Sequence, residues 1–417
     1  MSNKNVQLEL STSQKYLPAN GAATIYLMLK IIQPKITLDT NRLPLNISFV
    51  LDRSGSMQGP KLGYTKQAVQ FALRNLDSTD RVSLVTFDNQ VELPIPSTTA
   101  ENKDQLAQLV ETIYTRGSTN LSGGLLEGVN QVKSAYRQEL VNRVILLTDG
   151  LANEGLTDPA RLKELVTGVY AKGIGLSTLG VGSDFDEDLL VALAEAGGGN
   201  FYFIETPDAI PPIFAEELSG LLSVTGQNPT LKLTPAPGVR LSAVLGYEPT
   251  FADGALIKLP DIYNGDSKTV LVELQVTTGA PAMMPLTAVH FSYFDVSADL
   301  AKVDYDLQVS LEATNDAEAL SKGFDLTVTK EVELFRMAQA REDAIREADL
   351  GNFESARDIL YQKKINLNEI YLESGDEEIL HSMNKVEQEI NDLAAHTYSP
   401  IARKKMKNES YQQRRRN

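Results

Sequence analysis

One feature limits the possible folds of this chain more than any other. It is an apolar stretch that runs directly into a group of carboxylate and hydroxyl side chains. Residues 45–51 (LNISFVL) have the composition of a buried strand. Asp52, Ser54 and Ser56 follow at once, in the pattern Asp-x-Ser-x-Ser. The order predicts a core strand whose carboxyl end carries hard oxygen donors. One such pattern is weak by itself, because chance matches are common, so its meaning depends on the other turns of the chain.

Further turns carry the same kind of side chain. Thr119 lies in a Gly-Ser-Thr-Asn turn, and Asp149 follows another apolar stretch, residues 143–148. Ligands of open α/β sheets bind beyond the carboxyl ends of the strands. Hydroxyl and carboxylate oxygens, with no Cys and no nearby His, suit Mg²⁺ rather than zinc or copper. The turns therefore predict a divalent-metal site that holds Mg²⁺, with Mn²⁺ or Ca²⁺ as alternatives.

Residues 45–222 alternate short apolar stretches with amphipathic helical ones. This alternation predicts an α/β fold with a doubly wound, mostly parallel sheet. Besides 45–51 and 143–148, we expect strands at 82–87, 90–95, 174–181 and 200–204, and helices at 61–76, 121–138, 159–172 and 209–222. Pro94 and Pro96 are expected to end the strand at 90–95, which reads as a short edge strand.

The order of these motifs resembles the von Willebrand factor A family, whose metal-ion-dependent adhesion site (MIDAS) combines Asp-x-Ser-x-Ser with a distant Thr and a distant Asp. Asp52, Ser54, Ser56, Thr119 and Asp149 fill all five positions. The resemblance implies a Rossmann-like A-domain in which the three hydroxyls bind the metal directly when a ligand is present. It implies that the two aspartates act chiefly through water, and that a vacant coordination position accepts a carboxylate from a partner.

The resemblance extends beyond the metal motif. Residues 180–202, which contain Gly-Val-Gly-Ser, an acidic stretch and Gly-Gly-Gly-Asn-Phe-Tyr, are similar to the bacterial branch of the family. They are also similar to the A-domains of inter-alpha-trypsin-inhibitor heavy chains and of calcium-activated chloride channel proteins. The acids at 184–188 imitate a calcium-binding EF-hand loop, but Leu189 stands where that loop needs Gly. We expect these acids to cap a helix instead.

The flanking segments have a different pattern. Residues 6–13 and 23–32 are typical of β-strands, and strand patterns return at 230–233, 240–245, 269–277, 288–295 and 306–311. An isolated pair of strands is marginally stable in water. We therefore expect the early and late strands to share one all-β sandwich, with the α/β region inserted between them, and helix formers from about residue 329 to add a C-terminal helical segment.

These patterns divide the chain into successive parts. We expect N-terminal sandwich strands at 1–40, the A-domain at 41–224, the remainder of the sandwich at 225–325, a helical hairpin or bundle at 326–398, and a basic disordered tail at 399–417.

Composition excludes several classes of function. The net charge of -16 argues against a general nucleic-acid surface. No apolar stretch approaches the roughly 20 residues of a transmembrane helix. No signal peptide is visible, and cysteine is absent, so we expect a cytoplasmic protein. The histidines at 290, 381 and 396 lack the spacing of zinc ligands.

The patterns leave alternative functions open. The leading hypothesis is a non-enzymatic module that binds an acidic residue of a partner protein through the metal, with no catalytic residues and no other cofactor. The resemblance implies a MoxR-type AAA+ ATPase as a partner. One rival is a metal-dependent hydrolase, in which the metal activates water. Another is a self-assembling scaffold whose metal site grips a second copy.

Overall fold

The structure is a computed structural model of the 417-residue chain. It describes residues 6–35, 43–149, 152–182, 184–252, 254–298, 300–394 and 398–414. One compact unit comprises residues 37–225 and 296–300, and another comprises residues 1–36, 226–295 and 301–417.

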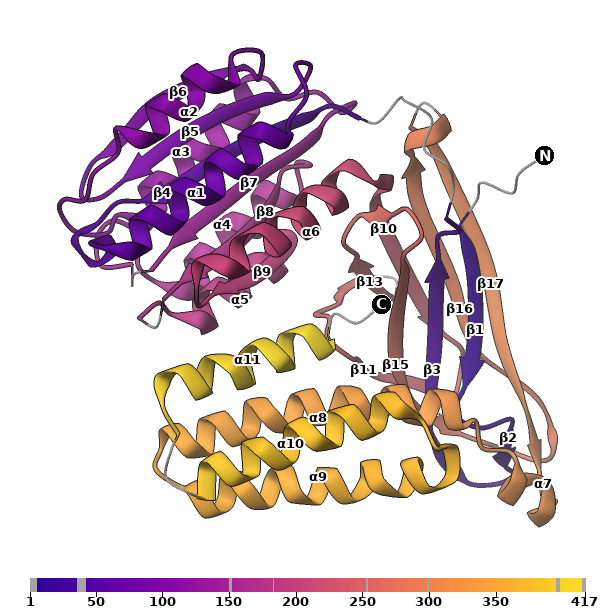
Figure 1. The fold of residues 1–417 in the computed structure, drawn as a ribbon. Helices are drawn as coiled ribbons and strands as arrows, with labels where there is room; N and C mark the ends of the chain where they lie inside the picture. Colours follow the sequence, from indigo (N-terminus) through magenta and orange to yellow (C-terminus); the bar gives the residue numbers. More distant parts are fainter. Residues whose placement is uncertain are drawn as a thin grey trace. The chain divides into compact units, whose positions relative to one another are not determined.

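A mostly parallel sheet forms the middle layer of the first unit (Figure 1). Its strands lie in the order β6-β5-β4-β7-β8-β9, and β6 alone among them runs antiparallel, to β5, in the described part of the chain. The strands are β4 (Leu45–Asp52), β5 (Arg81–Phe87), β6 (Val91–Thr99), β7 (Val141–Thr148), β8 (Gly175–Val181) and β9 (Gly198–Ile204). Every residue of β4, β7 and β8 is buried, which explains their nearly continuous apolar sequences.

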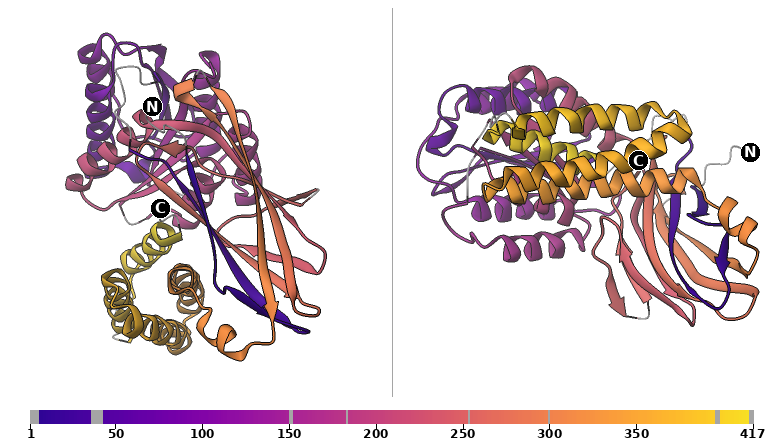
Figure 2. Two further views of the ribbon diagram at one scale, coloured as in Figure 1. Left: turned by 90° about the vertical axis from the view of Figure 1, so that its right-hand side faces the viewer. Right: turned by 90° about the horizontal axis from the view of Figure 1, so that it is seen from below.

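Helices cover both faces of this sheet (Figures 1 and 2). They are α1 (Pro60–Asn75), α2 (Lys103–Glu111), α3 (Leu121–Ser134), α4 (Pro159–Tyr170), α5 (Glu187–Ala196) and α6 (Ile210–Leu222), with 3₁₀ turns η1 (Gly55–Met57) and η2 (Pro207–Ala209). Asp158 caps α4 through the amide of Arg161. Asp186 caps α5 through the amide of Leu189, so the acidic stretch has the capping role expected from the sequence.

Glycine lets α3 lie close to the sheet. A Cβ atom on Gly128 would lie 2.3 Å from Val50 Cγ2, and one on Gly124 would lie 2.5 Å from the ring of Phe87. The missing side chains therefore allow a close approach of helix and strands. This approach brings the start of α3, and the turn that precedes it, to the carboxyl ends of β4 and β5.

The edge strand β6 corrects one expectation. It runs from Val91 to Thr99 and continues through Pro94 and Pro96, which were expected to end it. Its pairing with β5 is irregular, with register shifts between Val82 and Leu84 and between Leu84 and Thr86. An edge strand needs partners on one side alone, so it tolerates residues that lack an amide hydrogen.

A β-sandwich makes up much of the second unit. One sheet has the order β1-β3-β15-β11, and the other has the order β12-β13-β10-β16-β17-β2, with β14 beside β10. The strands are β1 (Gln7–Thr12), β2 (Tyr16–Pro18), β3 (Ala22–Ile32), β10 (Val224–Pro235), β11 (Val239–Val244), β12 (Thr250–Ala252), β13 (Gly254–Lys258), β14 (Ile262–Tyr263), β15 (Ser267–Thr277), β16 (Ala282–Asp295) and β17 (Ala301–Thr314); η3 (Val296–Ala298) lies between the last pair.

The N-terminal strands are integral to this sandwich. β3 pairs antiparallel with β15 along its whole length, from Ala22 opposite Thr277 to Ile32 opposite Ser267. Leu27 and Leu29 of β3 share a core with Leu231 and Phe291 from the other sheet. The chain thus leaves the sandwich after β3 and returns to it at β10. The predicted fold class, an α/β domain inserted in an all-β sandwich with a helical segment after it, is confirmed.

Helices complete the second unit: α7 (Ala317–Lys322), α8 (Leu326–Asp349), α9 (Phe353–Ser374), α10 (Glu377–Ala394) and α11 (Pro400–Arg414). α9 packs against α8 and α10, and α11 packs against α8 (Figure 1). The first turns of α8 bury Val328 and Val332 against Met28 and Leu271 of the sandwich. The helical segment is therefore a bundle that is packed on the sandwich.

The expected disordered tail is wrong for residues 400–414. α11 buries Met406 and Tyr411, and the Ser410 hydroxyl donates to the carbonyl of Ala338 at 3.0 Å. Its basic residues have acidic partners, such as Asp349 for Arg403 at 2.8 Å. The disorder was predicted from the basic residues of this segment, and the apolar residues between them were not taken into account. Paired basic side chains lose the mutual repulsion that favours disorder. Residues 415–417 lie outside the described residues.

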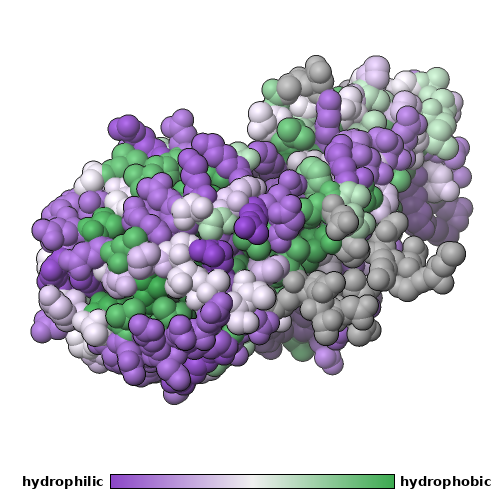
Figure 3. All heavy atoms as spheres, turned by 90° about the horizontal axis from the view of Figure 1, so that it is seen from above, coloured by the Kyte–Doolittle hydropathy of each residue, from purple (hydrophilic) through white to green (hydrophobic). Residues whose placement is uncertain are grey.

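No helix among the described residues is both long and apolar enough to cross a membrane. The face drawn in Figure 3 is largely hydrophilic, with hydrophobic side chains in small groups between the polar ones.

Candidate metal centre

The sequence-predicted aspartates lie at the ends of neighbouring strands. Asp52 is the last residue of β4, and Asp149 follows the last residue of β7. β4 and β7 are parallel and paired, with Leu51 opposite Leu147, so the two carboxylates meet at one edge of the sheet. Both residues are 0% exposed. Burial of acidic side chains in this way is costly unless hydrogen bonds and positive charge compensate for the lost water.

Hydrogen bonds link four of the five predicted ligands. The hydroxyls of Ser54 and Ser56 lie 3.0 Å apart, and Ser56 donates to Asp149 Oδ1 at 2.8 Å. Asp52 Oδ1 accepts from the Ser54 amide at 2.8 Å, and Asp52 Oδ2 accepts from the Thr148 hydroxyl at 2.5 Å. η1 follows directly after Ser54, and this tight turn brings Ser56 back toward the strand end.

The pKa of Asp52 is raised in this arrangement. Burial raises the pKa of Asp52 to about 6, and the charge of Asp149 adds to the rise, although the hydrogen bonds from Thr148 and Ser54 oppose it. A raised pKa means that the ionised carboxylate is disfavoured where it lies. A cation beside Asp52 and Asp149 would relieve this cost.

Thr119 lies on the loop that faces the Asp-x-Ser-x-Ser turn. The amide of Gly55 donates to the carbonyl of Gly117 at 3.0 Å, which ties the two loops together. Gly117 has a φ of +67°, a left-handed conformation that glycine adopts without strain. Thr119 is 3% exposed, and its amide donates to Asn153 Oδ1 at 2.9 Å. The loop that carries Thr119 thus lies against the Asp-x-Ser-x-Ser turn, and backbone hydrogen bonds hold Thr119 on that loop.

Sequence reasoning missed Lys61, which enters the site from the first turn of α1. Its Nζ atom donates to Asp149 Oδ2 at 2.6 Å and to Asp184 Oδ2 at 2.7 Å. Burial alone would lower the pKa of Lys61, but the carboxylates of Asp149 and Asp184 outweigh it and raise the pKa. Lys61 follows Ser56 by five positions, yet nothing in a linear pattern shows that its side chain turns back to the strand end.

An ion-pair cluster that sequence reasoning also missed supports the turn from the other side. Arg53 lies 2.9 Å from Asp88 and 2.8 Å from Glu92, and Arg116 lies 2.7 Å from the same Asp88. The hydrogen bond from Arg53 lowers the pKa of Glu92 to about 2. The amide of Arg116 also donates to the Arg53 carbonyl at 2.8 Å. The cluster joins the Asp-x-Ser-x-Ser turn to the loop that carries Thr119.

Histidine and acidic side chains elsewhere in the described chain are other possible metal ligands. Among the described residues, no group of three or more His, Cys, Asp or Glu side chains is arranged to hold a metal. His290 pairs with Asp304 at 3.2 Å and with Asp306 at 2.8 Å. His396 lies outside the described residues. The candidate centre differs because hydroxyls supply much of its donor set.

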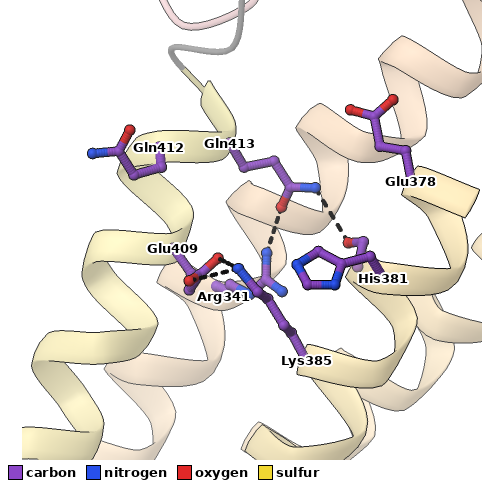
Figure 4. Close-up of a pocket in the computed structure, with 8 residues that line it drawn as sticks. Arg341, Glu378, His381, Lys385, Glu409, Gln412 and Gln413 are labelled. Atoms are coloured by element: carbon purple, nitrogen blue, oxygen red, sulfur yellow. Dashed lines mark hydrogen bonds and ion pairs between the residues drawn. The ribbon is translucent and has the colours of Figure 1, made fainter. Parts of the chain in front are cut away.

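A polar pocket of about 200 Å³ lies in the helical bundle (Figure 4). Arg341, which is 1% exposed, pairs there with Glu389 at 2.9 Å. Lys385 donates to both carboxylate oxygens of Glu409, at 2.8 and 2.7 Å. His381 lines the same pocket. Arg341 and Lys385 are already paired with Glu389 and Glu409. The pocket therefore offers no excess positive charge that would select a ligand.

Comparison with known proteins identifies the inserted unit. Residues 46–216 match the family model of the von Willebrand factor type A domain. The chain therefore carries a von Willebrand factor A domain, in agreement with the resemblance seen in its sequence. Domains of this family typically mediate protein–protein interactions.

Several known proteins are similar to this chain in sequence. An uncharacterized protein of Synechocystis is 27% identical over 361 residues, which are 82% of this chain and 84% of that protein. The uncharacterized protein YfbK of Escherichia coli is 27% identical over 49% of this chain and 36% of that protein. Inter-alpha-trypsin inhibitor heavy chain H3 of Homo sapiens is 31% identical over 36% of this chain, but the match spans only 18% of that protein.

The fold of the whole chain has counterparts among solved structures. A von Willebrand factor type A protein from Catenulispora acidiphila superposes with a TM-score of 0.72 at 17% identity, covering 94% of this chain and 90% of that one. The ArnB paralog VWA2 from Sulfolobus acidocaldarius has a TM-score of 0.65 at 18% identity, with 97% and 99% covered. The combination of A-domain, sandwich and helices therefore occurs in other proteins.

Proposed function

We propose that this chain is a metal-dependent protein-binding module that recognises an Asp or Glu side chain of its partner. The observation that carries the proposal is the hydrogen-bond chain from Ser54 through Ser56 to Asp149, at the carboxyl ends of adjacent strands. Together with Asp52 and Thr119 these residues would hold a divalent cation, Mg²⁺ in preference to Mn²⁺ or Ca²⁺. The bound cation would supply positive charge for the incoming carboxylate.

The donor set fits such an ion. Its oxygens come from neutral hydroxyls and from carboxylates, which are the ligands of hard cations. Asp52 is buried and its pKa is raised, so a cation beside it would favour its ionised form. If the hydroxyls bind the cation directly and the aspartates act chiefly through water, as the family resemblance implies, the cation keeps its attraction for a carboxylate from outside. This recognition is more directional than a surface ion pair.

The rival hydrolase is less well supported by the geometry. A hydrolase needs a general base within hydrogen-bond reach of a metal-activated water. Both oxygens of Asp52 accept from Ser54 and Thr148, and those of Asp149 accept from Ser56 and Lys61. Each carboxylate is thus held by two donors and belongs to the expected metal shell, so a hydrolase would have to use one residue as both metal ligand and base. We accordingly propose a non-enzymatic role, in which no residue is catalytic.

We propose two classes of partner for this site. A MoxR-type AAA+ ATPase is the partner class that the family resemblance implies. Self-assembly, in which the site grips an acidic loop of a second copy, is the alternative. The absence of cysteine supports a cytoplasmic location for either complex.

Affinity capture with the full chain tests the proposal. Immobilised wild type is exposed to a cell extract in Mg²⁺ or in chelator, and retained proteins are identified by mass spectrometry. We expect proteins that are retained in Mg²⁺, released by chelator, and absent from Asp149→Asn. Light scattering of the pure chain in both conditions detects self-assembly. Retention that is the same in chelator and in Mg²⁺, with no change in mass, would contradict the proposal.

A further inference from the structure

The surroundings of Lys61 at the candidate metal centre accommodate both its ammonium group and its aliphatic stem. Its side chain is 21% exposed and reaches from α1 to the strand ends, where its ammonium contacts Asp149 and Asp184 together. The stem of the side chain passes over Gly182, where a Cβ atom would lie 2.9 Å from Lys61 Cε. Gly182 has a φ of +76°, so the backbone there suits glycine and leaves room for the lysine stem.

The two carboxylates that hold Lys61 differ in their surroundings. Asp149 is fully buried, and its second oxygen accepts from Ser56. The Asp184 side chain is 63% exposed and lies between β8 and α5, outside the five predicted metal ligands. Lys61 can therefore release Asp149 and keep Asp184 as its partner. Such a movement costs less than the release of a cation that has one partner alone.

We propose that Lys61 is a tethered counter-ion that competes with the divalent cation for Asp149 and so sets the metal affinity of the site. The inference rests on the proposed function, since it concerns the same site. Without metal, the ammonium neutralises the buried carboxylate and keeps it in place. With metal, the like charges repel, and Lys61 turns toward Asp184. The lysine thus keeps the centre folded and limits its metal affinity.

Substitutions at the two ends of the bridge make opposite predictions. Lys61→Met removes the charge and keeps much of the stem, so the full chain should bind Mg²⁺ about tenfold more tightly, on the scale of charge repulsion across a few ångströms of partly solvated protein. In chelator the same variant should melt below wild type, because Asp149 loses its partner. Asp184→Asn leaves Lys61 with Asp149 alone, so Mg²⁺ should bind more weakly than to wild type.

Isothermal titration of the full-length variants with MgCl₂, together with thermal melts in chelator, tests this. Lys61→Arg keeps the charge and is the matched control, with affinity nearer to wild type than to Lys61→Met. A general loss of structure would weaken binding in every variant, so a gain in Lys61→Met and a loss in Asp184→Asn together support the competition. Equal or weaker binding by Lys61→Met, where wild type binds, would overturn it.

The same titration separates this inference from the proposed function. If Lys61→Met binds Mg²⁺ and wild type does not, the competition stands and the metal dependence of the natural chain fails. If neither binds, the proposed metal centre fails, and the competition fails with it.

Discussion

At the scale of single residues, Thr119 distinguishes partner capture from metal storage. Asp52, Ser54, Ser56 and Asp149 are linked by hydrogen bonds, whereas Thr119 is held through its backbone on the facing loop. The family resemblance implies that the threonine hydroxyl joins the metal when the ligand carboxylate arrives. Loss of that hydroxyl should therefore affect the liganded state above all.

We predict that Thr119→Ala weakens partner capture by roughly 5- to 150-fold, which corresponds to about 1–3 kcal/mol for one lost charge-assisted contact. Metal affinity, measured by calorimetry, should fall much less, because the other ligands remain. Thr112→Ala is the matched control: Thr112 is exposed, and its hydroxyl donates to the Leu109 carbonyl on α2. Equal losses of metal and partner would make Thr119 a plain structural ligand.

A second prediction at this scale concerns Glu92 in the ion-pair cluster. The hydrogen bond from Arg53 lowers the pKa of Glu92 from an ordinary 4.5 to about 2. Because the folded-state pKa is depressed, the stabilisation is present above about pH 4.5 and is lost as the pH falls toward 2. Glu92→Gln should cost about 0.5–1 kcal/mol at pH 7, since the side chain is partly exposed.

Urea denaturation of wild type and Glu92→Gln at pH 7 and pH 3 measures this difference in the free energy of unfolding. The difference should be smaller at pH 3, where Glu92 of the unfolded chain is mostly protonated, and it should vanish once the pH falls below about 2. A difference that stays constant across this range would show that Glu92 acts through packing rather than through charge.

At the scale of elements, the close packing of α3 on the sheet positions the start of that helix. We predict that Gly128→Ala lowers the free energy of unfolding by about 1–3 kcal/mol, the usual cost of overpacking. Its new Cβ would lie 2.3 Å from Val50 Cγ2. Gly168→Ala on α4 is the control, because nothing lies within 4 Å of its Cβ. That change should stabilise the chain by up to about 1 kcal/mol, through helix propensity. A loss of equal size in both variants, measured by denaturation, would mean that α3 does not pack as described.

The sequence predicted the elements of the A-domain better than the contacts between them. Continuous apolar stretches such as 45–51 and 143–148 are local signals, and the structure places strands on both. The bridge from Lys61 to Asp149 spans 88 positions, so no local pattern reveals it. The tail was misread for a related reason. Its charges are compensated by Glu342 and Asp349 of α8, which only the folded bundle brings near.

At the scale of the whole molecule, the sandwich depends on both ends of the chain. β3 lies between β1 and β15, so its removal would expose an unpaired edge of β15 and part of the core. We predict that a chain without residues 1–35 aggregates or melts well below wild type. Size-exclusion chromatography and thermal melting measure this. A monomer of unchanged stability would show that the early strands are dispensable.

The response of thermal stability to Mg²⁺ tests the proposed metal centre most directly. A ligand that binds the folded state alone raises the melting temperature by mass action. Calorimetric scans of the full chain should show a higher Tm in Mg²⁺ than in chelator, and Asp52→Asn with Asp149→Asn should abolish the rise. The exposed pair Asp104→Asn with Asp208→Asn should keep it. No rise in wild type, or an equal rise in the Asp52 and Asp149 variant, would contradict a divalent cation at this site.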